Sequence, residues 1–147
     1  MKKHLFLLII LSLLVACKQN TVDSANANSA SAVTQAQDIN AALIQAFQHK
    51  KSGIFVEGSG IVKKLLPDDN KGSRHQKFLV TLAPEQTLLF AHNIDLASAV
   101  PLAVGDTIQF RGEYVYNPKG GVMHWTHRDP QAKIAGGWIK HNGRTYH

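Results

Sequence analysis

The hydrophobic pattern changes its period at Gly53, and this change limits the fold more than any other feature of the sequence. Four apolar residues before it recur at helical spacing: Ile39, Leu43, Ile44 and Phe47. Their spacing predicts a helix over residues 38–51, with Asp38 as its N-cap. After Gly53, apolar and polar residues alternate and Gly or Pro recurs at short intervals, which is typical of β-strands joined by tight turns. We therefore expect one mainly β domain preceded by a helix.

Alternation and turn residues together define five expected strands: Ile54–Leu66, Lys77–Leu82, Thr87–His92, Thr107–Tyr116 and Val122–Thr126. Gly58 and Gly60 inside the first strand predict a sharp bend. Pro84-Glu85 predicts a turn, and Asn142-Gly143 predicts a terminal hairpin over residues 137–147. Short strands of this number, with a long bent first one, predict a small five-stranded barrel of the OB (oligonucleotide/oligosaccharide-binding) type, with one N-terminal helix and a C-terminal hairpin. An SH3-like barrel or a small sandwich is the alternative.

The N-terminus has the order of a secretory signal. Two lysines precede an apolar run over residues 5–15, which is shorter than the roughly 20 residues that a helix needs to cross a bilayer. The run ends in Leu14-Val15-Ala16-Cys17, the order of a lipobox. We therefore expect residues 1–16 to be a cleaved signal peptide and Cys17 to be a diacylated membrane anchor. The alternative is an ordinary signal with a chance Cys beside its cleavage site.

The anchor has consequences for the rest of the chain. Cys17 is the only cysteine, so a lipidated Cys17 leaves no thiol for a disulfide, a nucleophile or a metal ligand. Lys18 stands where an Asp would resemble an inner-membrane retention signal, so in a bacterium with two membranes we expect an outer-membrane anchor facing the periplasm. Residues 17–37 are rich in Ser, Asn, Gln, Ala and Thr, which predicts a flexible tether. Residues 38–147 remain as the folded domain, which we expect to be a monomer.

The chain is basic, with a formal charge of +6 that falls to +4 once Lys2 and Lys3 leave with the signal. Such an excess favours phosphate-bearing partners, lipopolysaccharide or nucleic acid. Five basic residues cluster around one expected loop: Lys63, Lys64, Lys71, Arg74 and Lys77. We favour the simpler interpretation of a solvated rim, because surface charge mainly serves solubility.

Four segments of the folded part combine histidine, tryptophan and glycine: Gly72–Phe78, Ala91–Asp95, Asn117–Pro130 and Gly136–Gly143. Together they resemble a bacterial family of small exported proteins designated domain of unknown function 3465, over about residues 53–147. The most specific element is His-Trp-Thr-His-x-Asp-Pro at residues 124–130. Arg128 departs from the pattern, because many members have a third histidine there, and a potential ligand is lost. The resemblance implies export and a small β domain, and it implies no known activity.

Histidines and one carboxylate form the candidate polar site: His75, His92, His124, His127, His141 and Asp129. Imidazole and carboxylate are ligands of zinc and other borderline divalent metals. The predicted metal ligands are His124, His127, Asp129 and His141. His124 and His127 would point to opposite faces of an extended strand, so they converge only if the strand ends near Thr126 and the chain turns at Asp129-Pro130. The alternative is that each histidine fixes a loop by bonding a carbonyl or a carboxylate.

Of the possible functions, a binding module for a small molecule, a glycan or an anion makes the fewest demands on how these residues are arranged. Its predicted binding residues are Arg74, Trp125 and Trp138, because tryptophan stacks on sugars and arginine holds anions. The alternative places both tryptophans in the core or as a lid above it. For Tyr114 and Tyr116 we expect core packing. From the expected envelope location, the partners are the membrane, a small molecule or glycan, or another envelope protein, and nucleic acid is not expected.

Two further functions remain open. In a metal-dependent hydrolase of phosphoesters or esters, His75 or His92 would be the general base and Asp129 would orient a histidine, while Arg74 or Arg111 would hold an anionic substrate. In a structural or assembly lipoprotein, the histidines would only hold loops. The sequence leaves open whether the protein is an enzyme.

Overall fold

The computed structural model describes residues 39–82 and 86–147. The expected signal peptide, Cys17, the tether, the Asp38 cap and the Pro84-Glu85 turn lie outside these residues. Within them, no helix combines the length and the apolar character of a membrane span.

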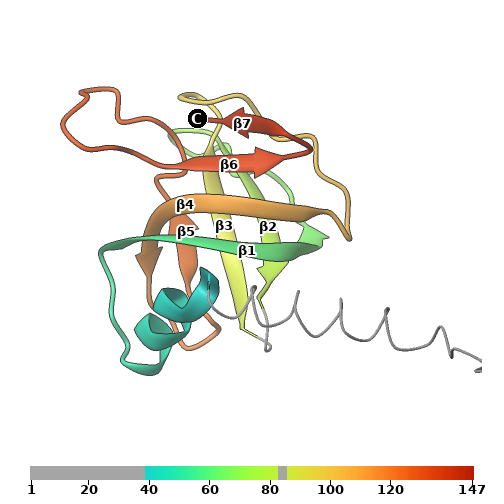
Figure 1. The fold of residues 1–147 in the computed structure, drawn as a ribbon. Helices are drawn as coiled ribbons and strands as arrows, with labels where there is room; N and C mark the ends of the chain where they lie inside the picture. The colour runs from blue at the N-terminus through green and yellow to red at the C-terminus, as the bar shows by residue number, and fades with distance from the viewer. Residues whose placement is uncertain (1–38, 83–85) are drawn as a thin grey trace, which may run out of the picture.

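The described residues form seven strands in one sheet: β1 (Ile54–Leu65), β2 (His75–Thr81), β3 (Thr87–Asn93), β4 (Thr107–Val115), β5 (Val122–His124), β6 (Trp138–His141) and β7 (Arg144–Tyr146). The strand order is β1-β2-β3-β5-β4-β6-β7, and β1 also pairs with β4, so the first five strands close into a barrel (Figure 1). Its pairings are antiparallel except for the parallel contact of β3 with β5. The predicted OB-type barrel is therefore confirmed, with its leading helix and its C-terminal hairpin, and the closed barrel rules out the sandwich alternative.

The fifth barrel strand is interrupted. Glu113 of β4 lies opposite His124, and Arg111 lies opposite Trp138. Because β1 occupies the other edge of β4, β5 and β6 follow one another along the same edge, and residues 125–137 leave the sheet between them. The expected strand over Val122–Thr126 was wrong at its end, since β5 stops at His124 and Trp125 has a left-handed φ of 54°. We call residues 125–137 the excursion.

The barrel interior is aromatic. Phe78 stacks on Phe90 with ring centroids 4.9 Å apart, and Phe90 meets Phe110 edge-on at 4.8 Å. Tyr114 is fully buried beside them, and Tyr116 packs partly buried against the core, so the core role expected of both tyrosines is confirmed. Close aromatic packing of this kind gives the strands a fixed frame.

The helix over residues 39–48 covers the barrel next to β1, at the lower end in Figure 1. The side chain of Asn40 accepts a hydrogen bond from the backbone N–H of Ser59 and donates one to its carbonyl oxygen, both at 2.9 Å. Gly58 permits this approach, because a Cβ there would lie 2.8 Å from both Asn40 Oδ1 and Leu43 Cδ1. The predicted bend of β1 thus serves to admit the helix, whose Leu43 enters the core.

Replacing Asn40 with Ala should destabilise the protein by about 1–3 kcal/mol, because both backbone groups of Ser59 lose their buried partner. Gln45→Ala, at an exposed position of the same helix, is the control and should change stability by about 0.5 kcal/mol or less. Urea denaturation of protein purified in detergent measures both. Equal effects of the two substitutions would contradict the docking role of Asn40.

Candidate functional site

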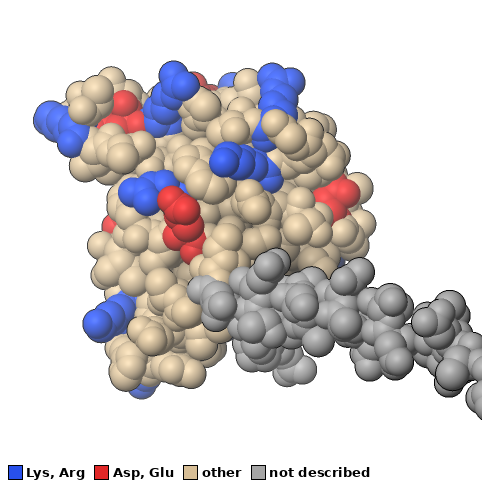
Figure 2. Space-filling view, viewed as in Figure 1, with Lys and Arg blue, Asp and Glu red and all other residues tan. Residues whose placement is uncertain are grey.

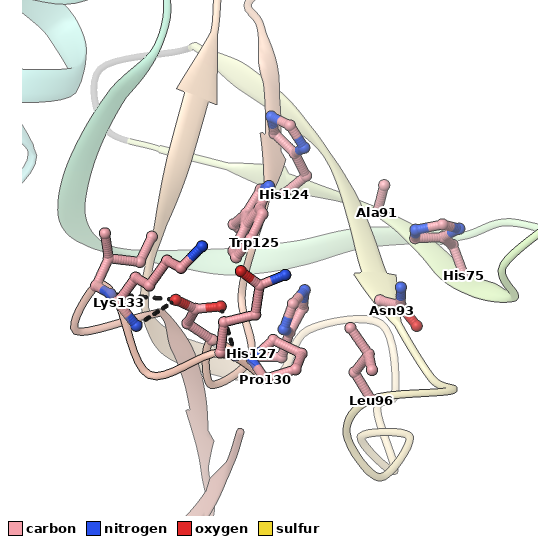
Figure 3. A pocket seen from close by; sticks show the side chains of 12 residues that line it. His75, Ala91, Asn93, Leu96, His124, Trp125, His127, Pro130 and Lys133 are labelled. Carbon is pink, nitrogen blue, oxygen red and sulfur yellow. Dashed lines mark hydrogen bonds between the residues drawn. The ribbon is translucent and has the colours of Figure 1, made fainter.

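A pocket of about 500 Å³ lies where the excursion faces the outer surface of β2, β3 and β5 (Figure 3). Its polar lining includes three imidazoles and two amides: His75, His124, His127, Asn93 and Gln131. Its apolar lining comes from Ala91, Leu96, Trp125, Pro130 and Ile134. Leu96 and Ile134 are exposed apolar residues, on two different loops. We call this the histidine pocket.

Strand alternation explains the floor of the pocket. In β3, Phe90 and His92 point into the barrel, so Ala91 and Asn93 point outward. His75 of β2 lies opposite Asn93, which puts its side chain on the same outer face. On the other side of β3, Phe90 pairs with Met123, so the next residue of β5, His124, also faces outward.

The excursion returns to the barrel through a narrow neck. The backbone N–H of Gly137 donates to the carbonyl of His127 at 2.8 Å, and Arg111 Nε donates to the carbonyl of Gly136 at 3.1 Å. A Cβ on Gly137 would overlap the carbonyl oxygens of Trp125 and Arg111. Only glycine fits there, and the two ends of the excursion are held against each other.

Asp129 organises the far part of the excursion. Its carboxylate accepts hydrogen bonds from the backbone N–H groups of Gln131, Lys133 and Ile134, at 3.0, 2.7 and 3.1 Å. The bond from Gln131 is the main reason why the pKa of Asp129 lies below its usual value. Both carboxylate oxygens therefore hold the loop that carries Gln131 and Ile134 into the pocket wall.

His127 has a fixed tautomer. Its Nδ1 lies 2.7 Å from the carbonyl oxygen of Arg128, and because a carbonyl can only accept, Nδ1 carries a proton, which leaves Nε2 as the acceptor of the neutral ring. The ring stacks on Trp125, with centroids 5.3 Å apart and 24° between the planes. The early end of β5 thus brings His124 and His127 into one pocket, which was the condition set by their spacing.

His92 is enclosed in the barrel beneath the pocket, fully buried. Its Nε2 donates to the carbonyl of Ser98 at 3.1 Å, and its Nδ1 accepts from the hydroxyl of Thr126 at 2.8 Å. Burial lowers its pKa, so the neutral ring is the stable form. The side chain joins the loop that follows β3 to the start of the excursion, the two walls of the pocket.

His124 contacts a carboxylate of the neighbouring strand. Its Nε2 lies 3.4 Å from Oε2 of Glu113 on the neighbouring β4. Among the described residues this nitrogen is buried and has no hydrogen-bond partner. The contact turns the imidazole toward β4 at one side of the pocket.

Other predicted site residues lie elsewhere. Arg74 forms an exposed ion pair with Asp95, Nε to Oδ1 at 2.7 Å. Trp138 is on β6 with the ammonium of Lys140 4.6 Å from its ring centroid. Arg111 pairs with Glu57 at 3.3 Å and holds the neck of the excursion.

The predicted metal ligands are divided between two places. His141 is nearly buried, with Nε2 2.9 Å from Oδ2 of Asp106, and it lines a different pocket beside Thr107 and Lys140. His124, His127 and Asp129 line the histidine pocket. Across residues 39–82 and 86–147, no group of three or more His, Cys, Asp or Glu side chains is placed to hold a metal ion.

Sequence reasoning missed several residues of the pocket: Ala91, Asn93, Leu96, Gln131 and Ile134. Alternation in β3 could have placed Asn93 outward, because Phe90 and His92 mark the inward face. Gln131 and Ile134 depend on the folded path of the excursion, which leaves no periodic signal.

Comparison with known proteins gives one family. Residues 25–147 match a family model described as Protein of unknown function (DUF3465), which confirms the predicted family. No curated protein matches the chain.

The lowered pKa of His92 predicts acid sensitivity. Above its unfolded pKa of about 6.5 the ring is neutral in both states and its contribution to stability is constant. Below that pH the unfolded chain takes up the proton first. The free energy of unfolding therefore decreases as the pH falls from about 6.5 to the lower pKa of the folded state. Denaturation between pH 8 and 4 should show a shallower decline for His92→Gln than for the exposed His49→Gln control. Equal slopes would mean that His92 does not titrate as its burial requires.

Proposed function

Because the chain belongs to this family, whose description assigns no activity, its function must come from its own site, and we propose that the barrel is a glycan-binding module. The observation that carries the proposal is the stacked Trp125–His127 pair in a pocket that also holds imidazoles and amides. A sugar has an apolar C–H face and a rim of hydroxyls, and it needs both kinds of lining.

The size and lining of the histidine pocket support this proposal. Its volume of about 500 Å³ lies within the range of small-molecule sites. Gln131 offers a donor and an acceptor, and Asn93 offers the donor Nδ2, because its Oδ1 already accepts from the backbone N–H of Asp95 at 2.9 Å. In the neutral ring of His127, Nε2 is a further acceptor. Leu96 and Ile134 give the rim an apolar surface that a ligand would cover.

The charges favour a neutral ligand over an anion. Besides the histidines, the charged side chains of the lining are Asp129 and Lys133. The carboxylate of Asp129 already accepts hydrogen bonds from backbone amides. Arg74, the predicted anion holder, is paired with Asp95 outside the lining. Figure 2 shows the opposite side of the barrel, over β1, β4 and β6, where basic side chains are spread singly with acidic groups among them.

The position on the barrel also favours a polymer-binding role. OB barrels use the face of their second and third strands for oligonucleotides and oligosaccharides, and the floor of the histidine pocket belongs to β2 and β3. Single-stranded nucleic acid needs several stacking platforms and a basic groove. Besides the histidines, the aromatic side chain of this lining is Trp125. A single stacking platform favours a glycan over single-stranded nucleic acid.

Two predicted catalytic residues have a supporting role in this proposal. His92 joins the two walls of the pocket from beneath, and Asp129 folds one wall. Both keep the shape of the pocket in the free protein. A preformed pocket loses less free energy to ordering when the ligand binds.

Replacing Trp125 with Ala should weaken glycan binding, because the ligand loses its stacking surface. Truncation of an aromatic hot spot costs about 2 kcal/mol or more, which is about thirtyfold in Kd. Trp138→Ala, on β6, is the matched control and should bind as the parent does. Isothermal titration with neutral oligosaccharides measures all three. Equal losses in both variants, or binding of inorganic phosphate in place of sugars, would contradict the proposal.

We also propose that Cys17 anchors the protein in the cell envelope through lipid, on the lipobox order of residues 14–17. Two or more acyl chains would hold it stably, where one chain gives marginal binding.

Replacing Cys17 with Ser should move the protein from the membrane fraction to the soluble fraction, because the acylated thiol is lost. Mass spectrometry of the parent should show acyl chains on an N-terminal Cys17. Fractionation followed by immunoblotting measures the shift, with Ser24→Ala in the expected tether as the control. A Cys17→Ser variant that stays in the membrane fraction would overturn the anchor.

A further inference from the structure

A second pocket continues the histidine pocket along the outside of the barrel. It has a volume of about 380 Å³, and its own residues are Asp69, Lys77, Val115 and Val122. It shares His75, Ala91 and His124 with the histidine pocket. We call it the valine pocket. The two pockets therefore meet over β2, β3 and β5.

The residue at their meeting point is small. Ala91 faces outward from the middle strand β3, and Lys77 of β2 lies opposite it. Figure 3 shows Ala91 between His124 on one side and His75 on the other. The methyl group of Ala91 projects little from the sheet at this point, whereas a longer side chain would stand between the two pockets.

The valine pocket is a formed part of the structure. Val115 and Val122 pair across β4 and β5 and are half-buried on the outer face. Asp69, from the loop before β2, is fixed by two backbone hydrogen bonds with His75, each 2.9 Å long. An apolar floor with polar edges again suits the C–H face and the hydroxyl rim of a sugar.

We propose that the two pockets are adjacent subsites for a linear glycan that carries acetamido groups, with successive sugar units on either side of Ala91. The inference rests on the proposed glycan binding and names its substrate class. In the histidine pocket, Nδ2 of Asn93 can donate to the C=O of an acetamido group and the side-chain oxygen of Gln131 can accept from its N–H, while Oδ1 of Asn93 is held by the N–H of Asp95. The exposed side chains of Leu96 and Ile134 match its methyl group. A single sugar fills one pocket, whereas a chain fills both.

The test is the dependence of affinity on ligand length, with N-acetylglucosamine, its dimer and its tetramer titrated into the full chain in detergent. The parent should bind the tetramer at least about tenfold more tightly than the monomer, because the second subsite contributes. Ala91→Leu should abolish this gain, because Ala91 lines both pockets. Thr81→Leu, an outward position of β2 away from both pockets, should keep the gain.

A second variant acts on the valine pocket alone. Lys77→Ala changes a residue that lines only this pocket, so it should lower tetramer affinity severalfold and leave monomer affinity unchanged. Equal affinity for all three lengths, or a gain that survives both Ala91→Leu and Lys77→Ala, would overturn the two-subsite inference and leave glycan binding standing. No binding of any oligosaccharide would overturn glycan binding and the inference together.

Discussion

The site depends on the neck at which the excursion leaves and rejoins the barrel. The carbonyls of Trp125 and Arg111 leave no room for a side chain at Gly137, whose N–H bonds the carbonyl of His127. β5 and β6 can then follow one another along the same edge of β4. With the ends pinned in this way, Trp125 and His127 are held over β3, and the outer face of the barrel becomes the floor of a pocket.

A buried polar contact beneath this neck completes the arrangement. His92 lies in the barrel interior, where most buried side chains are apolar, and it forms hydrogen bonds with both Thr126 and Ser98. Burying an imidazole is costly unless both nitrogens are satisfied, and here both are. The barrel gives up some apolar packing at this position, and two loops from different parts of the chain are fixed relative to each other.

The sequence predicted the strands well because each has one buried face. In β3, Leu88, Phe90 and His92 are buried and their neighbours are not, which is the alternation that defined the expected strand. The same rule failed at Trp125, whose left-handed φ ends β5 early and which has no sequence signal, since such a backbone is uncommon for a bulky residue. Alternation also gives no partner for a strand as short as β6, so its place after β5 along the edge of β4 depended on the folded register.

The candidate site was predicted in part. The motif at residues 124–130 placed Trp125, His127 and Asp129 near each other because they are close in the chain. His75 comes to the same pocket because the register of β2 with β3 places it opposite Asn93. Composition cannot predict that register. His141 was grouped with them on residue type alone, and it lies beside Asp106 in another pocket. Residue type shows which chemistry is available, and the pairing of strands decides which groups meet.

An interruption inside a barrel strand also has an evolutionary consequence. β5 and β6 each hold their own register with β4, so residues can be inserted or deleted in the excursion without shifting either half of the strand. Loops held in this way tolerate changes of length better than the elements that flank them. Selection can therefore reshape one wall of the pocket, and with it the choice of ligand, while the barrel that supports it stays the same.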